Sequence, residues 1–227
     1  MITRAVPKKS ALDFFGHARR ALWLPAFLLL LATGCAALPP PGAAPSPEVV
    51  QQRRAALSSI AYWDLRGRVG VRLPDEGAHA SLRWRHRGDG EEVDLTGPFG
   101  GGHARLQYDA TGARLRDARG REYQGADAET LLYRTTGWHV PLAALTYWIR
   151  GLPVPAVAAA EQLDEHGRLR ALKQLGWDIE FLAYDSVGEY ELPSKLYLAR
   201  GADATRVEVR LALSRWDIGQ PGAPSAP

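Results

Sequence analysis

The sequence predicts a mainly β domain of the α+β class, in which a long antiparallel sheet is interrupted by a pair of helices. Three observations lead to this expectation. Apolar and polar residues alternate with a period of two over most of the chain, which is typical of strands with one buried and one solvated face. Short Gly-containing turns separate these segments. Three other segments carry apolar residues at helical spacing.

The first 34 residues are predicted to be a secretory signal. Positions 1–20 hold five basic residues and one acidic residue, and an apolar run from Ala21 to Ala32 follows. A membrane-spanning helix needs about 20 apolar residues, and this run is shorter. We therefore expect cleavage; a short membrane helix that is never cut is the alternative.

The only Cys of the chain, Cys35, stands directly after this segment. The run Leu31-Ala-Thr-Gly-Cys35 resembles a bacterial lipobox, in which the Cys is lipid-modified and becomes the first mature residue. Ala36 follows where Asp would signal retention, and by resemblance to the sorting rule of enteric-type bacteria this points to the outer membrane. Several acyl chains on one Cys hold a protein firmly on a bilayer. We expect a lipid anchor at Cys35 on the periplasmic face of the outer membrane.

Residues 35–47 are expected to form a tether. Five prolines lie within residues 36–47, which favours polyproline II at about 3.1 Å per residue. The folded domain is then predicted over 48–218. Residues 219–227 are rich in Gly, Pro, Ala and Ser, and we expect a disordered tail there.

The charge balance does not indicate a nucleic-acid partner. The whole chain has 28 Lys and Arg against 25 Asp and Glu. Residues 1–34 hold five of those basic residues and one of the acidic ones, so the remaining 23 and 24 nearly cancel. A composition of 46% hydrophobic and 23% charged residues also argues against a wholly disordered chain and a multi-span membrane protein.

The helices are expected at Pro47–Ile60, at Ala126–Thr136 with Asp127 as N-cap, and from Pro141 to a stop at Gly151. Alternation places strands around 63–73, 80–87, 92–95, 103–108, 177–181, 196–198 and 207–213. The turns between strands are expected at 88–90, 97–100, 110–112 and 165–167.

Signatures of catalysis are scarce. The chain contains no GxSxG, no P-loop, no GxGxxG after a strand and no HExxH. One Cys excludes an intramolecular disulfide, and the His residues lack the spacing of metal ligands. We expect each His, including His79 and His86, to be solvated. The sequence therefore predicts no enzyme, no catalytic residues, no metal and no cofactor.

An arginine stripe is the strongest charge feature. Its members alternate with the tryptophans at 63 and 84, so the two sets point to opposite faces of the sheet: Arg66, Arg68, Arg72, Arg83, Arg85 and Arg87. The docking candidates among them are Arg66, Arg68, Arg83 and Arg85. The stripe is either a solvated face or a docking surface for an acidic partner or anionic lipid headgroups.

The apolar face of the sheet is the second feature, because few helical residues are available to cover it. Whether it packs solidly or encloses a cavity is left open by the sequence. The candidate lining residues are Leu65, Val69, Val71, Leu82, Trp84, Leu106, Leu145, Trp148, Ile179, Phe181, Leu198 and Val209. The third feature is Phe99, which sits in a Gly-rich turn beside Pro98 and Gly100 and either folds back or protrudes.

Taken together, these segments resemble the LolB family of outer-membrane lipoprotein receptors. The resemblance rests on the order of signal, lipobox and proline spacer, Tyr62-Trp-Asp-Leu-Arg-Gly-Arg-Val-Gly70, Leu95-Thr-Gly-Pro-Phe-Gly100, a helical pair, and Tyr147-Trp-Ile-Arg-Gly-Leu-Pro153. It implies an unclosed, curved antiparallel β-barrel with a helical lid over a hydrophobic cavity.

The resemblance also implies a function. Family members accept acylated lipoproteins from the periplasmic carrier LolA and insert them into the outer membrane. A protruding loop carries a bulky apolar residue needed for that insertion, and Phe99 matches its position. The expected partners are thus LolA, the lipoprotein cargo and outer-membrane lipids, and we expect a monomer.

Two other functions stay open at this point. The chain could be a structural or adaptor lipoprotein with a packed core that docks through the arginine stripe. A small-ligand binder of lipocalin type or an unrecognised envelope hydrolase is a third option.

Overall fold

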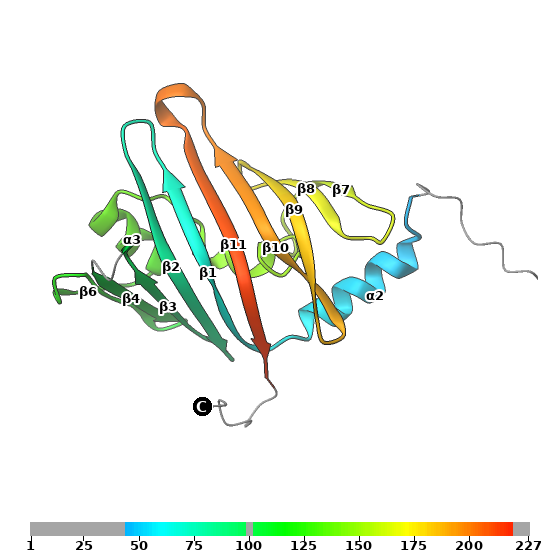
Figure 1. Ribbon diagram of the computed structural model, residues 1–227, viewed down its shortest axis with the longest axis horizontal. Helices are drawn as coiled ribbons and strands as arrows, with labels where there is room; N and C mark the ends of the chain where they lie inside the picture. Colours follow the sequence, from blue (N-terminus) through cyan, green and yellow to red (C-terminus); the bar gives the residue numbers. More distant parts are fainter. Residues whose placement is uncertain (1–43, 99–101, 220–227) are drawn as a thin grey trace, which may run out of the picture. The chain divides into compact units, whose positions relative to one another are not determined.

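The computed structural model describes residues 44–98 and 102–219, and its strands form one antiparallel sheet with helices on one side (Figure 1). The predicted positions Cys35, Phe99 and Gly100 lie outside these residues. The elements, in chain order, are α2 (Pro47–Ser58), β1 (Tyr62–Arg72), β2 (Gly77–Arg87), β3 (Gly90–Thr96), β4 (His103–Asp109), β5 (Gly112–Arg116), β6 (Glu122–Gly125), α3 (Ala128–Thr136), α4 (Leu142–Trp148), β7 (Ala159–Leu163), β8 (Leu169–Gln174), β9 (Trp177–Val187), β10 (Tyr190–Arg200), the 3-10 turn η3 (Asp203–Thr205) and β11 (Val207–Ile218).

The sheet consists of two meanders joined at one seam. Its strand order is β6-β5-β4-β3-β2-β1-β11-β10-β9-β8-β7, so each strand pairs with its chain neighbour except at the β1–β11 seam. The outermost strands, β6 and β7, are not paired with each other, and the barrel therefore stays open. The predicted fold class, an unclosed and curved antiparallel sheet with a helical cover, is confirmed.

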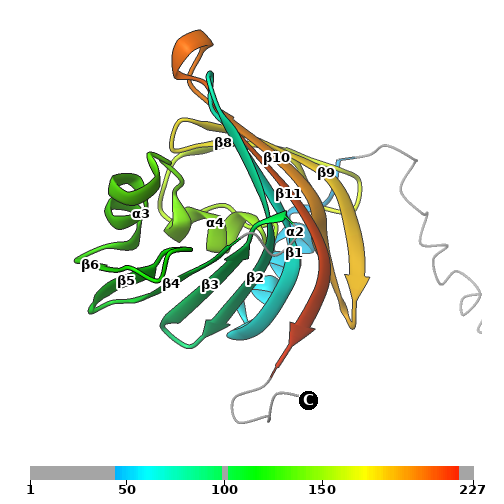
Figure 2. The same ribbon diagram turned by 60° about the vertical axis from the view of Figure 1, so that its left-hand side comes forward.

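A bulge at the seam bends the sheet. Arg66 faces Arg215 while Gly67 faces Leu213, so Ser214 is an extra residue on β11. Gly67 is required here, because a Cβ at this position would overlap the carbonyl oxygen of Ala212. The resulting curvature gives the sheet a concave face, over which α4 lies (Figure 2).

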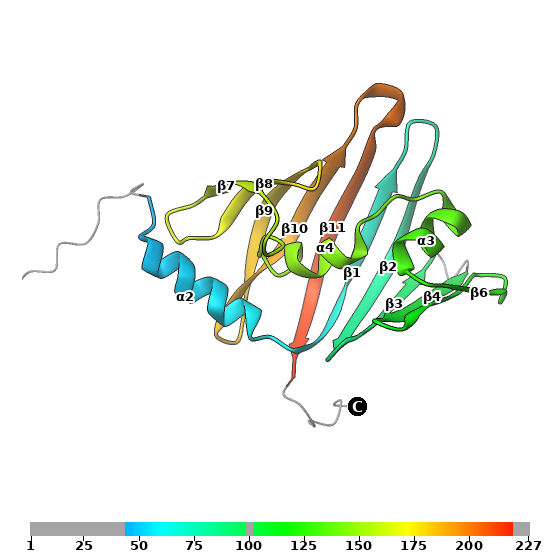
Figure 3. The same cartoon turned by 180° about the vertical axis from the view of Figure 1, so that it is seen from behind.

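The three helices lie over the same face of the sheet (Figure 3). The Asp127 carboxylate accepts a hydrogen bond from the Thr130 N–H, as an N-cap does, and Gly137 ends α3 in the left-handed region. Gly151 has a φ of 76° and ends the turn after α4. The predicted helices are therefore present, with α3 and α4 each starting one or two residues later than expected.

The short outer strands β5 to β8 were not singled out by the alternation, although the turns beside them were. For β6 and β7 the pattern is weak because they form the two edges of the sheet and have no buried residue, whereas β5 buries Ala113 and Leu115 and β8 buries Leu169 and Leu172. In β7, for example, Ala159 and Ala160 are both exposed, so no apolar face distinguishes the strand.

Two buried polar side chains fix the position of α4. The Arg150 guanidinium donates to the Ile60 carbonyl at 3.2 Å and to the Thr146 carbonyl at 2.9 Å, and it thereby links α4 to the end of α2. Burial lowers the pKa of Arg150, yet an arginine stays charged under any ordinary condition. The Gln174 amide bridges the Trp148 indole N–H at 3.0 Å and the Val154 backbone at 2.8 and 2.9 Å.

Replacing the buried Arg150 should therefore destabilise the domain. Arg150→Ala leaves helix-end carbonyls without a donor, and we expect the free energy of unfolding to fall by about 2–4 kcal/mol. Urea unfolding of the mature chain carrying Cys35→Ala measures this. The control Arg170→Ala removes an exposed arginine and should change stability by less than about 0.5 kcal/mol. Equal effects of the two substitutions would contradict the linking role of Arg150.

Candidate functional site

An apolar cavity of about 300 Å³ lies between the helical cover and the β1–β6 half of the sheet. An engineered apolar cavity of about 150 Å³ holds a benzene molecule, so this one has room for part of an acyl chain. Its lining residues are Val69, Val71, Ala80, Leu82, Trp84, Val93, Leu95, Gly97, Gly102, Ala104, Arg105, Leu106, Leu115, Asp117, Ala118, Tyr123, Leu132, Thr135, Trp138, Val140, Leu142, Leu145, Val209 and Leu211.

The structure brings together seven of the twelve candidate lining residues. These seven are Val69, Val71, Leu82, Trp84, Leu106, Leu145 and Val209. The other five lie in the packed core and are not among the lining residues: Leu65, Trp148, Ile179, Phe181 and Leu198.

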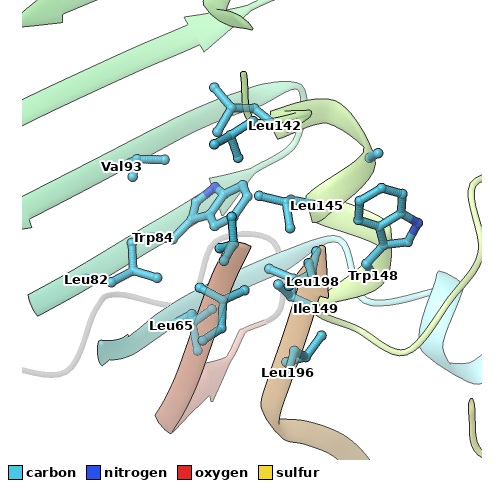
Figure 4. Close-up of a cluster of buried hydrophobic side chains, with 14 of the residues drawn as sticks. Leu65, Leu82, Trp84, Val93, Leu142, Leu145, Trp148, Ile149, Leu196 and Leu198 are labelled. Carbon is cyan, nitrogen blue, oxygen red and sulfur yellow. The ribbon is translucent and has the colours of Figure 1, made fainter. Parts of the chain in front are cut away.

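The difference arises because α4 divides the concave face into two halves. Leu142 and Leu145 point towards Trp84 on the cavity side, whereas Trp148 lies near Leu198 on the other side (Figure 4). In that second half α2 and the indole of Trp177, whose ring centroid is 6.5 Å from that of Trp148, fill the space. Alternation assigns a side chain to the concave face but cannot tell which half of that face is hollow.

Helix α3 covers the cavity with little buried surface of its own. Its buried side chains are Ala128, Leu131 and Leu132, and it contacts β4, β5 and β6 at the margin of the sheet. The Glu129 carboxylate accepts a hydrogen bond from the Ala143 N–H at 3.2 Å, at the start of α4, where Pro141 provides no side-chain cap. The shorter α4 buries Leu142, Ala144, Leu145 and the large Trp148, so α3 gains less from apolar burial and is the less firmly held of the two helices.

One end of the cavity lies at the base of the loop between β3 and β4. Gly97 and Gly102 belong to the lining and are joined by a backbone hydrogen bond of 2.9 Å. Lining residues at this end, such as Ala118, are partly or fully exposed, whereas Trp84 and Val93 at the far end are buried. The cavity therefore opens at this loop, which we call the loop end. Pro98, the first residue of the predicted insertion turn, is exposed here.

A polar cluster at the far end of the concave face was not anticipated from the sequence. The Glu91 carboxylate, which is buried, accepts from the Trp84 indole N–H at 2.6 Å and lies 2.6 Å from His86 Nδ1. His86 stacks on Trp63 with ring centroids 5.5 Å apart. The expectation of a solvated His86 was therefore wrong. The signal was present in the alternation, since His86 is two residues from Trp84 and shares its face.

The arginine stripe is partly neutralised. Arg83 pairs with Asp64, and Arg85 pairs with Glu92 and Asp94. Burial acts to raise the pKa of Asp94, but its hydrogen bonds and ion pairs with Arg105 and Arg85 outweigh this, and its pKa lies below the usual value. Arg66 and Arg68 are exposed, and no ion pair to either is found among the residues that the structure describes.

Within 44–98 and 102–219, no group of three or more His, Cys, Asp or Glu residues could hold a metal ion. A search of the same residues found no helix with the length and apolarity needed to cross a membrane.

The family model described as outer membrane lipoprotein LolB matches residues 61–216, a range that contains α3, α4 and every strand of the sheet except the last two residues of β11. The chain belongs to the LolB family. The outer-membrane lipoprotein LolB of Alkalilimnicola ehrlichii is 36% identical over 196 residues, which is 85% of this chain and 96% of that protein. The LolB of Pseudomonas savastanoi pv. phaseolicola is 35% identical over 192 residues, covering 83% and 92%. The crystal structure of a LolA superfamily protein from Nitrosomonas europaea aligns with 8% identity and a TM-score of 0.49, over 78% of this chain and 95% of that one.

The family model and the two named relatives confirm the family that the motifs indicated and the predicted location in the outer membrane. The matched range begins just before β1 and includes every lining residue of the cavity.

The cavity predicts that a bulky side chain in its wall blocks an apolar probe. Ala104 is a lining residue on β4 near the loop end. Ala104→Phe should weaken binding of a fluorescent fatty acid at least about tenfold, because the ring occupies space that the probe would fill and the probe loses the apolar contact of one or two side chains. The control Ala160→Phe adds the same ring at an exposed position of β7 and should leave probe affinity unchanged. If both variants bind the probe like the parent, the cavity is not the binding site.

Proposed function

We propose that this protein is the outer-membrane receptor that accepts acylated lipoproteins from the periplasmic carrier LolA and releases them into the outer membrane. The observation that carries the proposal is the apolar cavity of about 300 Å³ that opens beside the β3–β4 loop. Family membership supports the same role. The cargo, the carrier and membrane lipids are its proposed partners, and we propose that it acts as a monomer.

The chemistry of the cargo explains the need for such a cavity. A triacylated lipoprotein exposes about 40 methylenes, and transfer of each from water contributes about 0.8 kcal/mol. The acyl chains therefore cannot cross the periplasm unshielded. Apolar walls such as Val71, Leu82 and Leu145 replace water around a chain without requiring a specific hydrogen bond.

The cavity as it stands is smaller than a full set of acyl chains, so we propose that the cover moves outward when cargo enters. Helix α3 is the element suited to move, because few of its side chains are buried and it lies over the edge strands. Helix α4 stays in place, since Arg150 and Gln174 hold its end in the packed half. No nucleotide is needed if each step passes the chains to a more apolar environment.

The remaining parts position the cavity at the bilayer. We propose that residues 1–34 are removed, that Cys35 carries the lipid anchor, and that residues 35–47 tether a domain of residues 48–218, with 219–227 as a tail. Phe99, between Pro98 and Gly100, would enter the bilayer at the loop end. One inserted Phe contributes about 1.5–3 kcal/mol, which orients the domain but does not anchor it.

Docking of the carrier is proposed on the part of the arginine stripe that keeps its charge. Arg66 and Arg68 are exposed, and the described residues offer them no ion pair. Arg83 and Arg85 already form ion pairs with Asp64, Glu92 and Asp94, so they contribute less to the binding of an acidic partner.

Cells depleted of this protein test the proposed function directly. We expect lipoproteins destined for the outer membrane to accumulate on the carrier in the periplasm. Normal delivery in depleted cells would refute the receptor function.

The proposed insertion residue has a matched pair of variants. Phe99→Glu should leave fatty-acid probe binding intact and reduce release of cargo into vesicles at least about tenfold, because a carboxylate cannot enter the hydrocarbon region. Phe99→Leu keeps the apolar character and should transfer cargo normally. Unchanged transfer by the Glu variant would remove Phe99 from the mechanism.

The anchor is tested by Cys35→Ala in the full chain. Without the thiol no acyl chain can be attached, and we expect the protein in the soluble periplasmic fraction after cell fractionation. Retention of the variant in the outer-membrane fraction would show that something other than Cys35 holds it there.

A further inference from the structure

The β5–β6 hairpin lies against the base of the loop end of the cavity. A Cβ added to Gly102 would be 2.7 Å from the Cβ of Ala118, so the hairpin tip and the β3–β4 loop are in contact. Asp117 and Ala118 of this hairpin are themselves lining residues of the cavity. A surface that faces the loop end of the cavity therefore also faces the tip of the β5–β6 hairpin.

Three arginines are concentrated at this tip, at positions 116, 119 and 121. All three are exposed. A Cβ on Gly120 would lie 3.9 Å from a guanidinium nitrogen of Arg116, which places that charge beside the turn. By contrast, residues 97–102 of the neighbouring loop carry no charge.

Asp117 holds the turn rigid and takes up one of these charges. Its carboxylate accepts hydrogen bonds from the backbone N–H groups of Arg119 and Arg121, both at 2.9 Å, and from the Arg121 side chain at 2.8 Å. Glu122 faces Arg116 in register on β6, but among the described residues neither Arg116 nor Arg119 forms an ion pair. Two arginine charges thus remain free on a fixed turn next to the opening.

We propose that the tip of the β5–β6 hairpin, through Arg116 and Arg119, binds the anionic headgroups of the membrane that receives the cargo. The inference rests on the proposed function, because it assumes that the loop end faces this bilayer. The chain belongs to a family of outer-membrane lipoproteins, so a bilayer is always within reach of the domain. Guanidinium groups suit phosphate headgroups, since they donate in a planar, bidentate fashion. The contact would turn the cavity opening towards the membrane without inserting the hairpin.

The test compares two double variants of the mature chain carrying Cys35→Ala. Arg116→Gln/Arg119→Gln removes the free charges of the tip. Arg87→Gln/Arg170→Gln removes the same charge from two exposed arginines elsewhere. Arg87 lies at the turn between β2 and β3, at the end of these strands opposite the β3–β4 loop. Binding is measured by co-sedimentation with phosphatidylcholine vesicles, with and without about 30% phosphatidylglycerol.

We expect the parent to prefer the anionic vesicles and to lose this preference at about 1 M salt, because the Debye length there is only about 3 Å. Each basic residue near an anionic surface strengthens binding about fivefold, so the tip variant should lose on the order of 25-fold of its affinity for anionic vesicles. The control should lose no more than about threefold. Equal losses in the two variants, or no anionic preference in the parent, would overturn the proposal.

Cargo transfer separates this result from the receptor function. On neutral vesicles the tip variant should transfer cargo like the parent, because no anionic headgroup is present. If the tip variant instead slows carrier-dependent transfer equally on neutral and anionic vesicles, the tip docks a protein and the lipid proposal fails. If the parent transfers no cargo to any vesicle, the proposed function fails whatever the vesicle binding shows.

Discussion

The concave face of the sheet carries more apolar surface than its helices can cover, and this shortage shapes the rest of the molecule. Eleven strands contribute to that face, whereas the helices that lie over it have 12, 9 and 7 residues. α2 and the end of α4 fill one half solidly. The other half is left with only α3 and the start of α4 above it, and an apolar cavity remains there. A cavity of this kind destabilises a purely structural domain, so its presence indicates a ligand with apolar groups.

The two halves differ in how firmly their cover is held. In the packed half, polar groups are buried with partners: Arg150 binds the carbonyls at the end of α2, and Gln174 joins Trp148 to the Val154 backbone. Such contacts allow one position of α4, because any other leaves buried donors and acceptors unpaired. Over the cavity, the contacts of α3 include three small or aliphatic buried side chains and the hydrogen bond from the Ala143 N–H to Glu129. The helical pair thus combines a firmly held helix, α4, with a less firmly held one, α3. Uptake of a long apolar ligand requires this combination.

Many of the charged side chains on the outside of the sheet form ion pairs with one another. On β2 to β4 the arginines form ion pairs with carboxylates on neighbouring strands, and these pairs neutralise most of their charge. Exposed arginines for which the described residues offer no ion pair include Arg66 and Arg68 on the seam strand and Arg116 and Arg119 on the hairpin tip. The first pair lies on the convex face and the second beside the cavity opening, so the two are suited to different partners. Under the two proposals above, the first pair meets the carrier and the second meets the receiving membrane.

The sequence by itself determined the class of fold, the presence of the three helices, the Asp127 N-cap of α3, the face to which most side chains point, and the family. These depend on local periodicity, on capping residues and on motif order, all of which are written along the chain. It did not determine which half of the concave face is hollow: Leu65, Ile179 and Phe181 alternate as regularly as Val71 and Leu82, yet they are packed. Nor did it show that Arg83 and Arg85 meet carboxylates or that the β5–β6 tip lies beside the opening. Those outcomes depend on which residues from distant strands face one another, and only the register of the sheet and the placement of α4 decide that.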